Sequence, residues 1–186
     1  MLKLIKGDIT ELNSEVIVNA ANSELAKGHG VCGAIFEKAG DDLVKYCNRF
    51  RLFTKDNETI RCKTGDAVIT PAFRLSVINP AIKYIIHAVG PIYNDGKHNE
   101  ATLLATAYIK SVEIAVSCGV KSIAFPFISS GIYGYPIDEC ADVAMTTLRN
   151  LAATYPIEIT MCAFSDTDLH TLCEIPINNF TSPLIV

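Results

Sequence analysis

Two glycine-rich loops hold the residues whose types and spacing are best suited to binding chemistry. One reads FPFISSGIYGYP at positions 125–136 and directly follows the apolar run of residues 122–124. Within it, Ser129-Ser130-Gly131-Ile132-Tyr133-Gly134 leads toward Pro136 and a predicted helix. Glycine lets the backbone approach a ligand closely, and N–H groups ahead of a helix bind anions without any net positive charge. The composition of this loop therefore favours phosphate binding.

The other loop lies near the N-terminus and has a similar composition. It runs from Asn19-Ala20-Ala21-Asn22 through Lys27-Gly28-His29-Gly30-Val31-Cys32-Gly33 into a predicted helix. Either loop alone is consistent with a simple connection, but both are longer than chain reversal requires, and two such loops facing one crevice suit a diphosphate. The glycines also match the G-x-G-x-x-G dinucleotide fingerprint. We set that match aside because nine residues separate Val18 from Gly28 and no acidic residue closes a second strand about 20 positions later.

The elements that must position these loops follow from the apolar pattern, which alternates short runs with longer helical stretches. Strands are predicted over residues 2–5, 15–18, 66–70, 76–79, 83–89, 122–127 and 157–164. Helices are predicted over residues 31–47, 101–118, 137–155 and 166–174. The polar segment 48–64 is interpreted as a loop, and the breaker-rich tail 175–186 receives no assignment.

Strands that alternate with helices along one continuous chain indicate an α/β protein with three layers, α/β/α. Some consecutive strands lack a helical crossover, which predicts a mixed central sheet. We find no internal repeat or linker, so residues 1–186 are expected to form a single domain, with a core at about 3–173 and an apolar tail at 175–186. In open α/β sheets ligands bind beyond the carboxyl ends of the strands, where both loops fall.

Composition narrows the choice of partners. The chain has 186 residues and a formal net charge of −4, which argues against duplex nucleic acid because such partners require clustered cations. Seven scattered cysteines without a C-x-x-C pair indicate reduced thiols. No apolar stretch approaches the roughly 20 residues that span a bilayer, and the N-terminus shows no export signal. We therefore expect a cytoplasmic protein without membrane contact.

Longer motifs carry a specific resemblance. The chain is similar to the macrodomain family, which binds ADP-ribose, and most closely to the MacroD-type branch that hydrolyses ADP-ribosyl esters and O-acetyl-ADP-ribose. The resemblance covers about residues 3–173. Its motifs are GDIT at 7–10, VNAANSEL at 18–25, GVCGAIFEKAG at 30–40, CKTGDAVIT at 62–70, IIHAVGPIY at 85–93 and FPFISSGIYGYP at 125–136.

This resemblance implies a role for each part of the site. Asp8 accepts a hydrogen bond from the adenine amino group, Phe164 stacks on adenine, and Asn22 binds the distal ribose, near which Tyr133 packs. A turn cap, a core aromatic and a polar turn residue stay open as structural alternatives for the first three. The implied ligand-binding residues are Asp8, Ile9, Asn22, Gly28, His29, Gly30, Val31, Ser129, Ser130, Gly131, Ile132, Tyr133 and Phe164.

The sequence departs from the hydrolytic branch at residues that help water attack. The aspartate usual ten positions after Asn22 is Cys32, and the histidine usual a few residues later is Phe36. Cys32 could pair with His29 as a nucleophile or simply line the ribose pocket. A metal site built on these two residues would lack further ligands, so no metal is expected. His87, inside an apolar strand, is interpreted as a core histidine.

Together these features predict a monomeric protein that binds ADP-ribose and hydrolyses ADP-ribosyl esters, on acidic side chains or in O-acetyl-ADP-ribose, without metal or cofactor. The candidate catalytic residues are Asn22, Cys32 and Tyr133. The alternative is a non-catalytic reader that docks onto ADP-ribosylated proteins, which the replacements at Cys32 and Phe36 favour.

Overall fold

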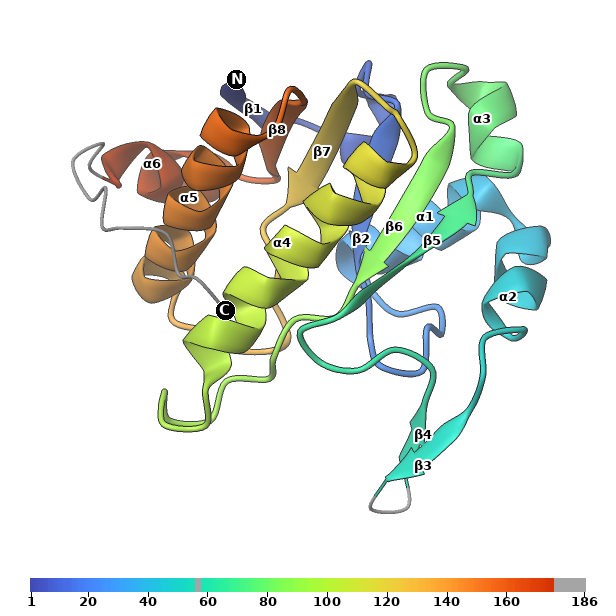
Figure 1. Ribbon diagram of the computed structural model, residues 1–186, viewed down its shortest axis with the longest axis horizontal. Coiled ribbons are helices and arrows are strands. Elements are labelled where there is room, and N and C mark those ends of the chain that lie inside the picture. The colour runs from blue at the N-terminus through green and yellow to red at the C-terminus, as the bar shows by residue number, and fades with distance from the viewer. Residues whose placement is uncertain (56–57, 176–186) are drawn as a thin grey trace.

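The computed structural model describes residues 1–55 and 58–175. A central six-stranded sheet has the strand order β1-β8-β7-β2-β6-β5 (Figure 1). Its strands are Leu2–Lys6 (β1), Val16–Ala20 (β2), Ala67–Pro71 (β5), Tyr84–Ala88 (β6), Ser122–Pro126 (β7) and Glu158–Ala163 (β8). Neighbouring strands run parallel except β5 and β6, which are antiparallel. The predicted mixed sheet is therefore confirmed.

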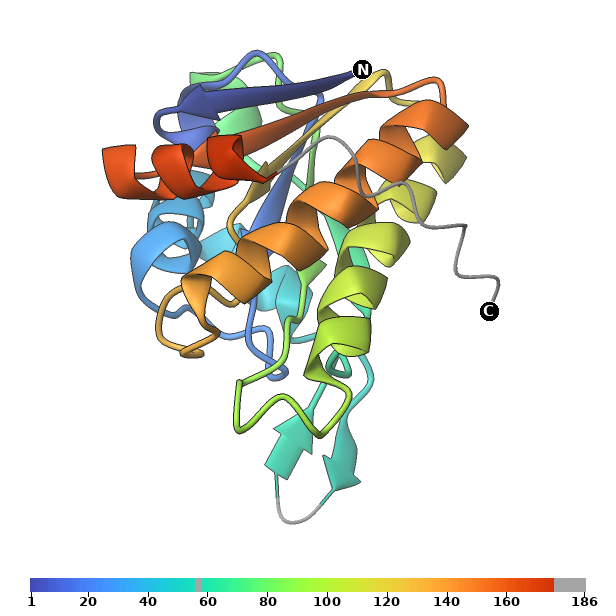
Figure 2. The ribbon, with the colours of Figure 1, turned by 90° about the vertical axis from the view of Figure 1, so that its left-hand side faces the viewer.

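Helices cover both faces of this sheet, which confirms the three-layer α/β/α architecture. One face carries α4 (Glu100–Ser117), α5 (Ile137–Thr154) and α6 (Asp166–Glu174), with α4 and α5 packed side by side (Figure 2). The other face carries α1 (Gly30–Ala39), α2 (Asp41–Cys47), α3 (Arg74–Ile78) and the short 3-10 helix η1 (Ile9–Glu11). Each helix layer has its own hydrophobic core against the sheet.

The apolar strands divide their side chains between these two cores. In β2, Val16 and Val18 face the α4–α5 layer, while Ile17 faces the α1–α2 layer, and all three are fully buried. A continuous apolar run is typical of a strand that is covered on both faces, because successive side chains point in opposite directions. This burial holds β2 rigid at the centre of the sheet, directly before one of the two glycine-rich loops.

Three sequence predictions need correction. Of residues 76–79, predicted as a strand, 76–78 belong to α3 and Asn79 is its C-cap; only Leu75 of this helix is buried in the core, while Val77 and Ile78 face solvent. The single helix predicted over residues 31–47 is two helices, interrupted at Gly40, whose φ of +83° a helix cannot contain.

The third correction concerns segment 48–64, predicted as a loop. It contains an antiparallel hairpin of β3 (Phe53–Lys55) and β4 (Glu58–Ile60), which projects beyond the sheet in Figure 1. The remaining predicted helices and strands are confirmed to within two residues at each end. The tail at 176–186 lies outside the described residues. Among the helices described, none is both long and apolar enough to cross a membrane.

Candidate ligand-binding site

The predicted site residues lie at one edge of the sheet. Because β1, β8, β7, β2 and β6 are parallel, their carboxyl ends meet there. The chain leaves these strands through Asp8 after β1, Asn22 after β2, Gly90 after β6, Ser129 after β7 and Phe164 after β8. This edge is the usual ligand position in open α/β sheets. The topology therefore brings together segments that are up to 156 residues apart in the chain, from Asp8 to Phe164.

The loop after β7 presents a row of free backbone donors. The N–H groups of residues 129–133 form no hydrogen bond with any other residue in the described ranges. The turn is closed behind them by Gly134 N–H donating to Gly131 O at 2.9 Å and Tyr135 N–H donating to Ser129 O at 3.2 Å. Ser129 itself takes a φ of +68°, a left-handed conformation that turns the chain sharply. Consecutive free N–H groups of this kind form a concave anion site.

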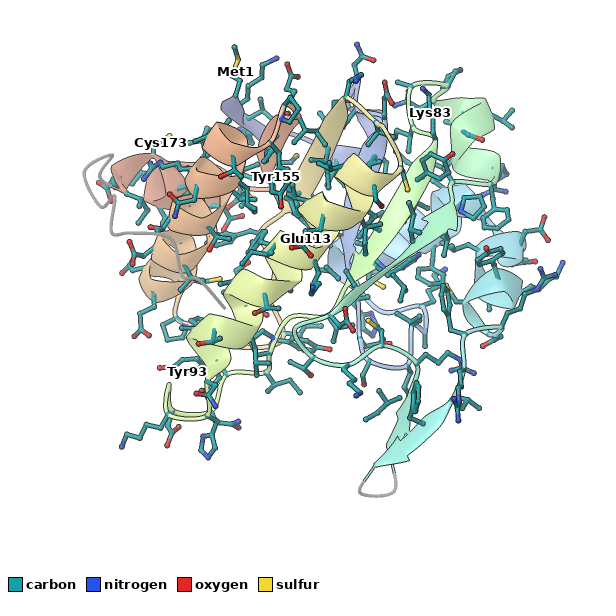
Figure 3. The ribbon with its side chains drawn as sticks, viewed as in Figure 1. Met1, Lys83, Tyr93, Glu113, Tyr155 and Cys173 are labelled. Atoms are coloured by element: carbon teal, nitrogen blue, oxygen red, sulfur yellow. The ribbon has the colours of Figure 1, made fainter. Side chains whose placement is uncertain are left out.

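Contacts from neighbouring segments hold this loop in place. Ser129 Oγ donates to Pro91 O at 2.9 Å, and Tyr93 N–H donates to Tyr133 O at 2.9 Å. The buried Tyr108 hydroxyl accepts the Ile128 N–H at 3.2 Å. Tyr93 lies at the N-terminal end of α4 (Figure 3). The segment after β6 thus supports the loop, a role that sequence reasoning missed although it includes the conspicuous Gly90-Pro91 pair.

Tight packing against Gly90 adds to this support. A Cβ atom at position 90 would lie 2.6 Å from Ile128 Cγ2 and would also collide with Ser129 Oγ. A side chain at this position would force the Ile128 and Ser129 side chains to move, so glycine allows the two segments to approach each other closely.

The loop after β2 is organised by Asn22. Its Oδ1 accepts the Ala26 N–H at 2.9 Å, and its Nδ2 donates to Ala26 O at 3.1 Å. Both ends of the amide therefore close a five-residue loop, from 22 to 26. One lone pair of Oδ1 and one N–H of Nδ2 stay unused, and these can serve a ligand. Asn22 is therefore a polar turn residue, one of the alternatives left open above. Its remaining lone pair and N–H can still form hydrogen bonds with a ribose hydroxyl.

Helix α1 begins where this loop ends and adds further donors. The N–H groups of residues 29–32 form no hydrogen bond within the part of the chain that the structure describes, as expected for the first turn of a helix. Gly28 O packs so closely against Gly33 that a Cβ there would lie 2.8 Å away. The glycines therefore permit a path on which Gly28, His29, Gly30 and Val31 expose backbone rather than side-chain atoms. Free N–H groups at a helix N-terminus favour an anion.

Cys32 lies at the base of this loop with its side chain buried. Its Sγ accepts from Gly28 N–H at 3.4 Å and from Asn19 Nδ2 at 3.6 Å, and it donates to Ala26 O at 3.7 Å. His29 is not among these hydrogen-bond partners, and its own side chain makes no capping bond to α1. This arrangement matches a pocket-lining thiol rather than a Cys–His pair.

Tyr133 connects the two loops. Burial raises the pKa of its phenol, and the nearby Cys32 sulfur raises it further. An electrostatic influence of this kind acts over a short range, so the Tyr133 and Cys32 side chains lie near each other and the loops after β2 and β7 are neighbours at the carboxyl edge of the sheet. A phenol with a raised pKa stays protonated at neutral pH and remains a hydrogen-bond donor.

A buried polar chain lies behind Cys32, in the sheet itself. Asn19 and His87 are neighbours on β2 and β6, and Asn19 Nδ2 lies 3.1 Å from His87 Nδ1. The other ring nitrogen of His87 lies 3.1 Å from Thr70 Oγ1 on β5. Burial lowers the His87 pKa to about 3, so the ring is neutral. The interpretation of His87 as a core histidine is confirmed, because the side chain is fully buried and both ring nitrogens have partners.

At the opposite end of the crevice, Asp8 and Phe164 lie side by side, because Gly7 N–H donates to Ala163 O at 3.0 Å. Asp8 caps η1 by accepting the Thr10 N–H at 2.9 Å, and it pairs with Lys38 at 3.0 Å. Burial raises the Asp8 pKa, but the bonds from Thr10 and Lys38 outweigh it, and the net pKa lies below its ordinary value. Its carboxylate is thus ionised and still partly exposed.

The two apolar side chains of the predicted site are exposed. Phe164 is 88% exposed and Ile132 is 84% exposed. The core-aromatic alternative for Phe164 is therefore wrong. A bare aromatic face next to a carboxylate suits a heteroaromatic base that carries an amino group. Ile9, the first residue of η1, is buried and packs in the core of the α1–α2 layer.

One cluster of possible metal ligands lies outside this crevice. Side-chain ligand atoms of Asp95, His98 and Glu100 all lie within 4.8 Å of one another. The buried Glu100 carboxylate accepts backbone N–H groups of Asn94 at 3.2 Å and His98 at 2.6 Å. Through these bonds Glu100 caps the loop that precedes α4, which explains why the three side chains lie close together.

The comparisons with known proteins agree with this geometry. Residues 18–144 match the model of the Macro domain family, and the chain belongs to that family. It is 44% identical over 156 residues to a protein of Escherichia fergusonii named O-acetyl-ADP-ribose deacetylase, a match that covers 84% of this chain and 82% of the relative.

Two solved structures show the same fold. A macrodomain of Oceanobacillus iheyensis, solved with ADP, is 37% identical and superimposes with a TM-score of 0.83 over 93% of this chain and 88% of that one. A Trypanosoma brucei macrodomain in complex with ADP-ribose is 27% identical, with a TM-score of 0.76 over 92% of this chain and 67% of that one.

Proposed function

We propose that this protein binds ADP-ribose along the carboxyl edge of its sheet and hydrolyses ADP-ribosyl esters, including O-acetyl-ADP-ribose, without a metal ion. The observation that carries the proposal is the pair of loops after the adjacent strands β2 and β7, whose backbone N–H groups at 29–32 and 129–133 have no partner among the described residues. Such a site neutralises a diphosphate although the chain is acidic. The named activity of the Escherichia relative and the ligands of the two solved macrodomains support the same choice.

The ends of the crevice orient the ligand. Asp8 and Phe164 suit the adenine, since a carboxylate accepts the amino group and an exposed ring stacks on the base. Asn22, with its spare N–H and lone pair, suits the distal ribose. The reacting ester then lies next to Cys32 and Tyr133, where the two loops meet.

Hydrolysis at this position adds water to the ester. The water oxygen forms a bond to the carbonyl carbon, the bond from that carbon to the ribose oxygen breaks, and the ribose oxygen leaves as a hydroxyl. Cys32 supplies no carboxylate, and the resemblance to macrodomains without that carboxylate implies that the ligand's own phosphate takes a proton from the water. That proton passes to the departing ribose oxygen, and the acyl group is released as a carboxylic acid. Holding water and ester in register lowers the barrier by removing translational and rotational freedom before the reaction.

The first test is a timed hydrolysis of ester-linked ADP-ribose on a modified protein, with Asn22→Ala, Cys32→Ala and the matched control Ser23→Ala. Among the described residues, Ser23 forms hydrogen bonds only through its backbone carbonyl, so its substitution should leave the loop intact. We expect release that collapses in Asn22→Ala and persists in the other two variants. Loss of release in both Asn22→Ala and Cys32→Ala would instead identify a thiol mechanism.

A non-catalytic reader is the second candidate function, and the replacements at Cys32 and Phe36 favour it. The same experiment separates the two. Absence of release by the wild-type protein, combined with ADP-ribose binding that calorimetry detects, would establish the reader.

A further inference from the structure

A cluster of cations flanks the proposed distal ribose site. The hairpin β3–β4 and its two connections carry Arg49, Arg51, Arg61 and Lys63, which we name the basic hairpin surface. Three of these, Arg49, Arg51 and Lys63, are exposed. By sequence, segment 48–64 holds five Lys and Arg against two Asp and Glu, a local excess of three cations in a chain whose formal net charge is −4.

Within the described residues, these four side chains have no carboxylate partner, whereas six of the chain's other twelve lysines and arginines do. In the described ranges, none of them forms an ion pair. Six lysines elsewhere each pair with a carboxylate: Lys3, Lys6, Lys38, Lys45, Lys83 and Lys110. The basic hairpin surface therefore has charge available for an external anion.

Stacking holds two of the guanidinium groups on this surface. Arg49 lies over the Tyr46 ring at 5.6 Å and Arg51 over the Phe53 ring at 5.3 Å, measured from the guanidinium carbon to the ring centroid. An arginine that is stacked on its face keeps the N–H groups of its edge free, and these match the two oxygens of a carboxylate. The ordering cost of binding an anion is correspondingly smaller.

The hairpin is fixed to the loop that carries Asn22. The N–H groups of Arg61 and Cys62 donate to Ser23 O at 2.8 and 3.0 Å, and Arg61 Nη1 donates to Glu24 O at 3.0 Å. Ser23 and Glu24 directly follow Asn22. Figure 1 shows the hairpin extending past the carboxyl edge of the sheet, so it reaches beyond the ribose end of the crevice.

We infer that the basic hairpin surface docks the acidic polypeptide segment around an ADP-ribosylated side chain. This inference rests on the proposed function, because the ligand end nearest Asn22 is the end attached to protein. Carboxylates on either side of the modified residue then meet Arg49, Arg51 and Lys63. The surface selects among protein substrates and has no part in binding free ADP-ribose.

The test compares two peptides that carry the same ester-linked ADP-ribose, one flanked by Asp and Glu and the other by Asn and Gln. The variant is Arg51→Gln/Lys63→Gln, and its matched control is Lys97→Gln/Lys121→Gln, two exposed lysines without ion pairs in the described ranges. For the wild type, KM should be roughly 5-fold lower for the acidic peptide, since two exposed charge contacts act together. This preference should disappear in the Arg51→Gln/Lys63→Gln variant and in high salt, and persist in the control.

Free ADP-ribose affinity, measured by calorimetry for the wild type and both double variants, separates the two proposals. Equal KM values for both peptides in a wild type that binds ADP-ribose would overturn the docking inference and leave the proposed function intact. A wild type that fails to bind free ADP-ribose would overturn the function itself. Displacement of the acidic peptide by a single-stranded oligonucleotide at lower concentration than by an unmodified acidic peptide would also overturn the inference, in favour of a nucleic-acid surface.

Discussion

Asn19 Nδ2 donates a hydrogen bond to His87 Nδ1 over 3.1 Å, between two strands that are covered on both faces. Since Asn19 is the donor, His87 Nδ1 is the acceptor, and the ring proton resides on Nε2 and points to Thr70 Oγ1. The same amide nitrogen reaches Cys32 Sγ at 3.6 Å. The tautomer of the buried, neutral His87 and the orientation of the Asn19 amide that contacts the Cys32 thiol are thus coupled.

This network predicts a specific dependence of stability on pH. The folded-state pKa of His87 is about 3, well below the ordinary value of 6.5, so only the unfolded chain gains a proton between these values. Stability from this group is complete above pH 6.5 and decreases as pH falls toward 3. Between pH 7 and pH 5 the free energy of unfolding should fall by about 2 kcal/mol more in the wild type than in His87→Gln.

Urea unfolding at the two pH values measures this difference. His170→Gln is the matched control, because His170 is exposed and pairs with Glu174 on the surface of α6. That variant should retain the wild-type pH dependence. A His87→Gln protein with the same slope as wild type would show that His87 is not the group responsible.

The sequence could predict that His87 is buried and neutral, because a histidine inside a continuous apolar strand is covered on both faces. Its partners were not predictable. Asn19 and Thr70 are separated from His87 by 68 and 17 residues, and only the strand order brings them together.

The same distinction holds for the other elements. Strands covered on both faces and long amphipathic helices can be predicted from their apolar period. The short elements α3, β3 and β4 could not be predicted in this way, because α3 has five residues and only Leu75 of them is buried, and β3 and β4 have three residues each. Glycine content marked both ligand loops. The support that Gly90 and Pro91 give to Ser129 depends on a contact across 38 residues, which no local pattern encodes.

Gly90 offers a direct test of that support. In Gly90→Ala the new methyl group would lie 2.6 Å from Ile128 Cγ2, so the loop at 129–133 must shift. We expect ADP-ribose affinity to fall about tenfold while the fold survives, because overpacking typically costs about 1–3 kcal/mol. Gly7→Ala is the matched control, as a Cβ there meets nothing within 4 Å. Unchanged affinity in Gly90→Ala, measured by calorimetry, would show that the loop does not depend on this contact.

Phe164→Ala should weaken binding without destabilising the protein. The ring is 88% exposed and so contributes little to the core, whereas stacking of a base on an aromatic ring is worth about 1–3 kcal/mol. We expect roughly a tenfold rise in the Kd for ADP-ribose and an unchanged Tm. Val77→Ala, at a position that is 79% exposed on α3, is the control.

The ligand itself provides a second control for Phe164. A competitor that keeps the diphosphate and distal ribose but lacks adenine should bind wild type and Phe164→Ala equally. If the variant lost affinity for that competitor as well, Phe164 would act on the phosphate end rather than on the base.

Cys32→Asp tests whether the missing carboxylate limits the rate. Asn19 Nδ2 and Gly28 N–H already point at the sulfur, so an aspartate here has two donors for its negative charge. A general base at this position should raise the rate of ester hydrolysis at least tenfold, since positioned bases contribute about a hundredfold or more in favourable geometry. The measurement is kcat for ester-linked ADP-ribose as a function of pH.

Cys32→Asn is the matched control because it has the same size and accepts the same hydrogen bonds but cannot take a proton from water. In Cys32→Asp the rate should fall as pH drops through the pKa of the new carboxyl group, and the control should lack this step. Equal rates for the two variants would mean that bond-making is not limited by a base at this position. Positioning of the ester by Asn22 and the two donor loops would then account for the whole rate.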